Sequence, residues 1–369
     1  EPFLGDNGAF TATPGGTTAS AAPGAAIVLD YAPVADSSFG RNPNASQNYP
    51  KDHYGYITEF DVGANANVPY DSTTGNGHQK IGQMGRSRWE NATFVTGEDW
   101  KLVSGQPIVI YGGDDRRGGR IFKFVTSANW TTGMTKAQTR NLLASGKIYV
   151  AHFTDLKNDG NGLTLAGDVT PTKAAPGTGV WIELSVNNTT QDAPNAPTLG
   201  AGTKVGAALS SINWNGMGGF TSDNLVHSVL YTASNKIGVR ELNRPEDLEY
   251  NPFDQSIYIA FTNHNRGTAL NNNGVLNVTN GTVRPDRSGA VFTMKEGNVA
   301  APGSSTTFTF WASWVGVRAQ NSTDPFVASC PDNVLIDPEG GVWFGTDGNP
   351  GNNNRADAVY YLDLEENKA

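Results

Sequence analysis

Short segments in which apolar and polar residues alternate recur along most of the chain. They are bounded by glycine, proline, asparagine or aspartate, and they cover residues 54–61, 107–111, 120–125, 147–153, 179–184, 256–262, 289–294, 341–346 and 358–364. Alternation with a period of two is typical of half-buried antiparallel strands. The pattern therefore predicts an all-β protein with many tight turns.

Two segments have helical periodicity instead. Residues 135–145 end at Gly146, and residues 223–236 follow Ser222 or Asp223 as the N-cap, with Gly238 just beyond their end. Glycine after the last helical residue and a small polar residue before the first are the usual helix boundaries. An apolar stripe on the second helix predicts that it packs against the rim of the β structure; the stripe comprises Leu225, Val226, Val229, Leu230 and Ala233.

The first residues differ in composition from the rest. Residues 1–26 are rich in glycine, threonine, alanine and proline without periodicity, which predicts an extended arm. Residues 27–369 are long enough to form one large β domain. With 44 glycines and 20 prolines in 369 residues, turns are frequent enough for a β-propeller.

Net charge, cysteine content and hydropathy limit the kinds of ligand, cross-link and membrane association that the chain can have. The formal net charge is −9, which argues against nucleic acid, because proteins that bind it usually have a basic face. A negative surface suits cations, although a solvated acidic surface is the more common explanation. Cys330 is the single cysteine, so an internal disulfide is excluded. No apolar run is long enough for a membrane span.

One motif occurs twice, and we call it the proline–acid motif. Residues 244–252 read RPEDLEYNP before the strand 256–262, and residues 331–338 read PDNVLIDP before the strand 341–346. The second copy follows the first by about two propeller blades of ~40–50 residues each. Strands of a propeller surround a central channel, so acids at matching places on different blades can converge on one metal site. Capping of a turn ahead of each strand is the alternative.

The acidic residues of this motif are the first candidates for chemistry. They are Glu246, Asp247 and Glu249 in the first copy, with Asp332 and the amide Asn333 in the second. Because proline fixes the backbone at the entrance of each strand, the next side chain has a defined direction. Carboxylate and amide oxygens in such a place could ligate a hard cation.

Two more segments add candidates. Glu90 lies between aromatic and small residues in RSRWENA, residues 86–92, which indicates a partly buried carboxylate that needs a partner. Asp114 and Asp115 lie in GGDDRRGG, residues 112–119, which is either a hairpin turn with solvated charges or a calcium-binding loop. Arg244, just before the first proline–acid motif, could hold a phosphate oxyanion or pair with a neighbouring acid.

At these segments the chain resembles the PhoX-type alkaline phosphatases, also described as DUF839 proteins. The similar segments follow one another in order and are GRSRWENATFV, VIYGGDDRRGGRIFKFV, LLASGKIYVAHF, NRPEDLEYNP and SCPDNVLIDPEGGVWFGTDG. The resemblance covers roughly residues 54–364. It implies a six-bladed β-propeller that hydrolyses phosphomonoesters, and export to the periplasm, the cell surface or the medium.

The resemblance also implies roles for individual residues. Calcium and a pair of irons are the family's metals, and the carboxylates of Glu90, Glu246 and Asp332 would be ligands. Asp114 and Asp115 would be calcium-site residues, and Asp247 and Asn333 would complete the metal set. Arg244 would contact the substrate phosphate, and Glu246 would take part with it in catalysis.

The chain also departs from the family pattern. Trp89 stands where the family commonly has histidine, and Cys330 belongs to another motif than the family's iron-ligating cysteine. The early segment with that cysteine and a late Gln-His-Pro-Gly segment have no counterpart here. The chain thus resembles the central part of a family member: either a fragment that other chains would complete, or a divergent relative that has lost part of the site. A non-catalytic propeller acting as a scaffold, or another calcium-dependent hydrolase, remain the alternatives.

Overall fold

The computed structural model describes residues 33–34, 49–50, 55–157, 163–194, 199–211, 219–263 and 287–364. The predicted arm, residues 1–26, lies outside the described residues, and the single domain over 27–369 stays a prediction. Of the helices in the described part, none has the length and apolar character that a membrane crossing requires.

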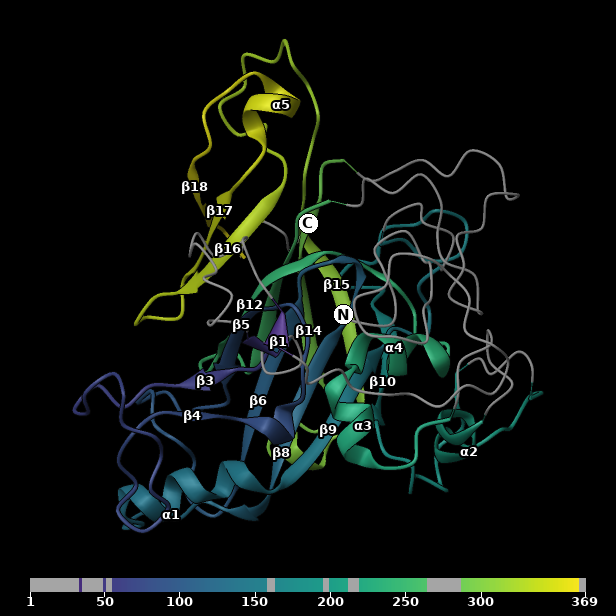
Figure 1. Ribbon diagram of the computed structural model, residues 1–369. Helices are drawn as coiled ribbons and strands as arrows, with labels where there is room; N and C mark the ends of the chain where they lie inside the picture. The colour runs from purple at the N-terminus through teal and green to yellow at the C-terminus, as the bar shows by residue number, and fades with distance from the viewer. Residues whose placement is uncertain are drawn as a thin grey trace.

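One antiparallel sheet of nine strands dominates the fold (Figure 1), in the order β12-β13-β14-β15-β10-β9-β8-β6-β5. Alternation of apolar and polar residues, rich in aromatic and β-branched types, favours these strands. Their bounds are β5 (Trp89–Phe94), β6 (Pro107–Asp114), β8 (Ile121–Asn129), β9 (Gly146–His152), β10 (Gly177–Glu183), β12 (Pro245–Asn251), β13 (Ser256–Phe261), β14 (Ala290–Glu296) and β15 (Thr307–Val315).

The sheet is nearly closed, because its two outermost strands, β5 and β12, contact each other. Asn91 on β5 donates from Nδ2 to the carbonyl of Leu248 at 2.5 Å. Thr93 donates from Oγ1 to Glu249 at 2.7 Å and accepts the amide of Tyr250 at 3.3 Å. Side chains of one strand thus bind the backbone and a carboxylate of the other.

An aromatic core fills the space inside the curved sheet. The ring of Phe153 lies 5.0 Å from that of Phe308, which in turn lies 5.3 Å from that of Trp181. A buried ion pair also lies there, with Lys123 Nζ 3.0 Å from Glu296 Oε1. The carboxylate of Glu296 accepts further hydrogen bonds from the hydroxyl of Tyr111 at 2.6 Å and the indole of Trp181 at 2.9 Å, so its buried charge is fully engaged.

Helices α3 and α4 cover part of one outer face of the large sheet. The α-helices are α1 (Lys136–Asn141), α2 (Val205–Ser210), α3 (Asp223–Ser228), α4 (Leu230–Lys236) and α5 (Asn349–Asn353). Figure 1 shows α3 and α4 beside β9 and β10, and their apolar residues share one core cluster with Ile148 and Ile182. Single turns of 3-10 helix are η2 (Gly82–Met84), η3 (Leu142–Ala144) and η4 (Pro302–Ser304).

The predicted helix 223–236 is interrupted, which corrects the sequence-based expectation. Ser222 is its N-cap and Gly238 follows its end at φ 77°, as the sequence indicates. At Val229, however, φ −146° and ψ 56° end α3 before α4 begins. Val229 is fully buried, so packing of this β-branched residue outweighs helical continuity.

A three-stranded sheet stands at another flank and consists of β16 (Pro331–Ile336), β17 (Val342–Thr346) and β18 (Val359–Leu362). Its inner face, with Val334 and Phe344, packs against Tyr258 and Val291 on the outside of the large sheet. Two-stranded pairs complete the described fold: β1 (Pro33–Val34) with β2 (Tyr49–Pro50), β3 (Thr58–Glu59) with β4 (Gln79–Lys80), and β7 (Arg117–Gly119) with β11 (Leu242–Asn243).

The all-β fold class is confirmed, and the curved sheet with its flanking sheet is propeller-like. The two copies of the proline–acid motif begin β12 and β16, which belong to different sheets and contact each other. Convergence of the copies is therefore observed, although the strands between them share one continuous sheet. In the described part of the predicted segment 54–61, residues 55–61, the strand is only β3, residues 58–59, and Tyr56 adds an isolated bridge to Arg86.

Candidate active site

A tight turn between β6 and β8 carries the first acid of the site, Asp115. Within it the amide of Arg116 donates to the carbonyl of Asp114 at 2.8 Å, and the amide of Gly119 donates to that of Arg116 at 2.7 Å. Gly118 has φ 73°, and a Cβ on Gly119 would lie 2.0 Å from the Asp114 carbonyl. The glycines of this segment are thus required by the geometry of the turn.

The start of β12 supplies the second acid. Arg244 has φ 47°, an uncommon conformation for a residue with a side chain, and it precedes Pro245 and the buried Glu246. The missing side chain of Gly113 makes room for this strand, since a Cβ there would lie 2.7 Å from the carbonyl of Pro245. The strained backbone of Arg244 and the close approach of Pro245 to Gly113 together direct the side chain of Glu246 toward the hairpin turn.

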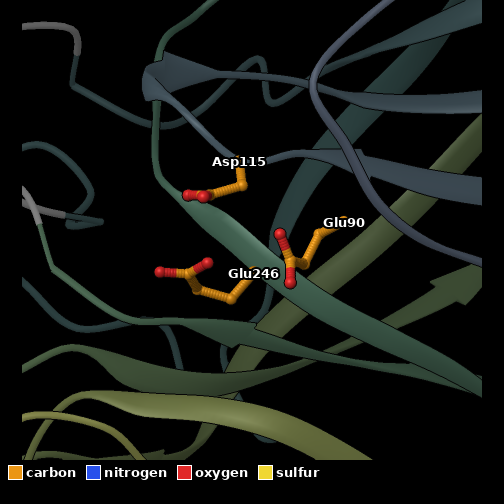
Figure 2. A group of neighbouring side chains, drawn as sticks. All are labelled: Glu90, Asp115 and Glu246. Atoms are coloured by element: carbon orange, nitrogen blue, oxygen red, sulfur yellow. The ribbon is translucent and has the colours of Figure 1, made fainter. Parts of the chain in front are cut away.

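The third acid, Glu90, lies on β5 and is exposed. Ligand oxygens of Glu90, Asp115 and Glu246 all lie within 4.8 Å of one another. Figure 2 shows the three carboxylates gathered at one place although they come from different strands and turns. We call these three residues the carboxylate cluster.

Arg244 is the cation of this site. Its Nη2 lies 2.9 Å from Asp115 Oδ1 and 2.5 Å from Glu246 Oε1, and its Nε donates to Asp115 Oδ1 at 2.9 Å. One guanidinium therefore bridges two acids of the cluster. With three carboxylates and one arginine, the group has a formal charge of −2 when fully ionised.

Crowding of like charges affects the protonation of the cluster. Burial raises the pKa of Glu246 to about 9, the negative charges of Asp115 and Asp332 add to the rise, and Arg244 partly opposes it. The pKa of Glu90 is also raised: although its side chain is largely exposed, its carboxyl is partly desolvated, and the charges of Asp115 and Asp332 contribute further. Each shift reports a site where a cation would relieve an electrostatic penalty.

Asp332 from the second proline–acid motif lies next to the cluster and is half-buried. Burial raises the pKa of its carboxyl, and Asp347 and Asp247 contribute the largest neighbouring charges. Asp347 opens the Asn- and Gly-rich segment 347–357, whose sequence is compatible with calcium binding but does not fit EF-hand spacing. Asp347 itself lies directly after β17, the strand that pairs with β16.

Other predicted site residues have different surroundings. Asp114 is buried and its Oδ1 accepts the amide of Arg88 at 3.1 Å. Asp247 accepts the amide of Leu248 with one oxygen and that of Val334 with the other, each at 2.8 Å, so it links the two sheets.

The remaining acidic and amide candidates are also outside the carboxylate cluster. Asn333 is exposed. Glu249 accepts a hydrogen bond from Thr93 at the contact of β5 and β12, and burial raises its pKa to about 7. The set that the structure brings together is therefore Glu90, Asp115 and Glu246, beside Arg244 and Asp332.

The donor set fits a hard cation. Within the described part of the chain, the group of side chains close enough to hold an ion offers carboxylate oxygens only, which calcium prefers. Cys330 is buried and its sulfur accepts a hydrogen bond from Asn352 Nδ2 at 3.1 Å, apart from the cluster. Trp89, at the position where histidine is common, packs edge-on against Phe122 and donates to the carbonyl of Gly85.

Comparison with known proteins identifies a family for the chain. The family model described as alkaline phosphatase PhoX matches residues 28–365. A solved structure, Pseudomonas fluorescens PhoX in complex with vanadate, a transition state analogue, is similar with a TM-score of 0.58 and 20% identity. The match covers 86% of this chain and 48% of that chain, so the chain spans about half the length of its structural neighbour. Among curated proteins there is no significant match.

Proposed function

We propose that this chain, which belongs to the PhoX alkaline phosphatase family, hydrolyses phosphomonoesters at the carboxylate cluster. The observation that carries the proposal is the convergence of Glu90, Asp115 and Glu246 from separate strands and a turn, with Arg244 among them. The similar Pseudomonas fluorescens PhoX structure is in complex with vanadate, a transition state analogue. Small phosphate esters are therefore the proposed substrates.

The proposed cofactor site is the carboxylate cluster itself. Glu90, Asp115 and Glu246 would hold calcium, with Asp332 as a further oxygen donor. When bound, the cation supplies Lewis acidity that polarises the phosphoryl oxygens. Iron would need ligands other than the family's cysteine, because that cysteine has no counterpart in this sequence.

In this proposal Arg244, which is held by Asp115 and Glu246, binds the substrate phosphate. Its planar guanidinium matches two oxygens of a phosphate as well as it matches a carboxylate. Held by Asp115 and Glu246, it is pre-oriented at the cluster, so little side-chain entropy is lost when an ester binds. Charge that develops on the phosphoryl group during transfer is then stabilised by a fixed donor. Burial and the nearby charges of Asp115 and Asp332 raise the pKa of Glu246 to about 9 despite the contact with Arg244, so a bound metal ion would favour its ionised form.

Turnover of a chromogenic phosphate monoester by the purified chain tests the proposal. Activity with calcium, its loss in a chelator and its return on adding calcium are expected, and supplying iron separately tests the second metal. Glu90→Gln should reduce turnover at least tenfold, while Glu339→Gln, an exposed glutamate on another loop, should not. Absence of turnover with both metals supplied would instead favour a scaffold, the reading that Trp89 supports.

Two further features of the family pattern remain proposals for this chain. Export beyond the cytoplasm is proposed because the family is typically exported, and cell fractionation tests it. Completion of the fold by other polypeptide is proposed because the chain spans half of its structural neighbour. Intact mass of the native material tests this second proposal.

A further inference from the structure

Two buried arginines lie directly behind the turn that carries Asp115. Arg116 and Arg120 belong to this turn, and their side chains are 3% and 0% exposed. Buried guanidinium groups are costly unless they are well engaged, so their retention next to the carboxylate cluster calls for a physical reason. Both approach the same aromatic ring, Tyr231 on α4, with guanidinium carbons 4.3 Å and 5.6 Å from its centre.

Arg120 ties together three segments of the chain. Its Nη1 donates to the carbonyls of Gly118 and Gly119 in the turn, the second at 3.2 Å. Its Nη2 donates to Asn235 Oδ1 at 3.1 Å on α4 and to the Val239 carbonyl at 2.8 Å. Asn235 is itself fixed, because its Nδ2 donates to the Tyr231 carbonyl at 2.9 Å.

These contacts reach both the turn that carries Asp115 and the segment of the chain that leads to Glu246. Residues 117–119 of the turn form β7, which pairs with β11, and β11 ends at the residue before Arg244. The turn places Asp115, and β11 leads directly to Arg244 and Glu246. A guanidinium that binds turn, helix and the approach to β11 at once therefore sets the distance between Asp115 and Glu246.

We propose that Tyr231, Asn235, Arg116 and Arg120 form a clamp that positions the carboxylate cluster for its cation. The inference rests on the proposed function for its ligand, and it concerns residues that touch neither substrate nor cation. Cation–π contact with a desolvated ring is among the stronger interactions of this kind, so loss of the ring should loosen the turn. Misplacement of one ligand by an ångström is enough to weaken a site greatly.

The test compares two substitutions of Tyr231 with a matched control. Tyr231→Leu removes the ring, Tyr231→Phe retains it, and Val226→Ala on α3 creates a cavity in the same core cluster away from the turn. Terbium luminescence with calcium competition measures cation affinity. We expect at least tenfold weaker binding for Tyr231→Leu, and affinity within twofold of wild type for Tyr231→Phe and Val226→Ala.

Amide hydrogen exchange of residues 113–121 gives a second readout that needs no cation. Tyr231→Leu should exchange at least tenfold faster in this segment, and Val226→Ala should not. Equal exchange and equal affinity in Tyr231→Leu and wild type would overturn the clamp, and so would the same losses in Val226→Ala. If the wild type binds no cation, the proposed metal site fails and the exchange rates alone decide the clamp. Should Tyr231→Leu fail to fold, Asn235→Ala, which removes an acceptor of Arg120, is judged by the same limits.

Discussion

Replacing the titratable carboxyl of Glu246 by an amide should reduce the pH dependence of the free energy of unfolding in the protein without a bound metal ion. Glu246 is 6% exposed and is crowded by Asp115 and Asp332. Burial raises its pKa from the usual 4.5 to about 9, so the folded state holds this proton across neutral pH while the unfolded state has lost it. A folded state that binds more protons loses stability as pH rises, here from about 4.5 to about 9. Glu246→Gln removes this proton exchange.

The size of the effect follows from the shift. A carboxyl protonated only in the folded state lowers the free energy of unfolding by at most ~1.4 kcal/mol per pH unit. Because Arg244 and Asp115 are only half-buried, solvent screens their interaction with Glu246, and we halve this value to ~0.7 kcal/mol per pH unit. Between pH 6 and pH 8 wild type should therefore lose about 1.4 kcal/mol through Glu246, which corresponds to roughly 2 °C in melting temperature for a chain of this length.

Urea unfolding of wild type, Glu246→Gln and the exposed control Glu339→Gln, each at pH 6, 7 and 8 in chelator, measures the effect. Wild type and the control should lose stability in parallel, and Glu246→Gln should lose about 1.4 kcal/mol less over this range. Saturating calcium should reduce the slope of wild type, because a bound cation favours the ionised carboxylate. Parallel slopes for wild type and Glu246→Gln in chelator would refute the assignment of Glu246 as a buried, crowded carboxyl.

Three other substitutions have defined outcomes. Arg244→Lys should raise KM and lower kcat/KM of ester hydrolysis at least tenfold, because an ammonium cannot make the paired contacts, while the exposed Arg318→Lys should leave both unchanged. Asp247→Ala should lower the free energy of unfolding by about 1–3 kcal/mol in urea, since two backbone amides lose their acceptor. Lys123→Met should cost about 3–5 kcal/mol by leaving the buried Glu296 without its cation, and adding Glu296→Gln should recover part of that loss; no recovery would contradict the pairing.

Much of the strand content was predictable from alternation, and the exceptions have physical causes. β15 was missed because its alternation covers only residues 307–310, after which Trp311 and Ala312 interrupt the pattern of TFTFWASWV. A register shift opposite Val291 and Phe292 disturbs the alternation further. β12 and β16 contain acids that serve the site, and their charges hide strands that are well packed in the structure.

The site was predictable as a set of segments but not as a set of side chains. Neighbouring acids such as Asp114 and Asp115, or Glu246 and Asp247, project in different directions from an extended backbone, so one of each pair reaches the cluster. Register and twist decide which one, and neither is visible in the sequence. The left-handed backbone conformation of Arg244 could not be predicted either, because an arginine before a proline has no sequence signal for a positive φ.

The meeting of β5 and β12 has a consequence for how this protein comes apart. Glu90 belongs to one of these strands and Glu246 to the other, on either side of the line where the curved sheet shuts. An ion shared by the two carboxylates would therefore join the two ends of the sheet. Without this ion, the carboxylates repel each other across the contact of β5 and β12, which is held mainly by side chains. Unfolding of the nearly closed sheet should therefore begin at this contact.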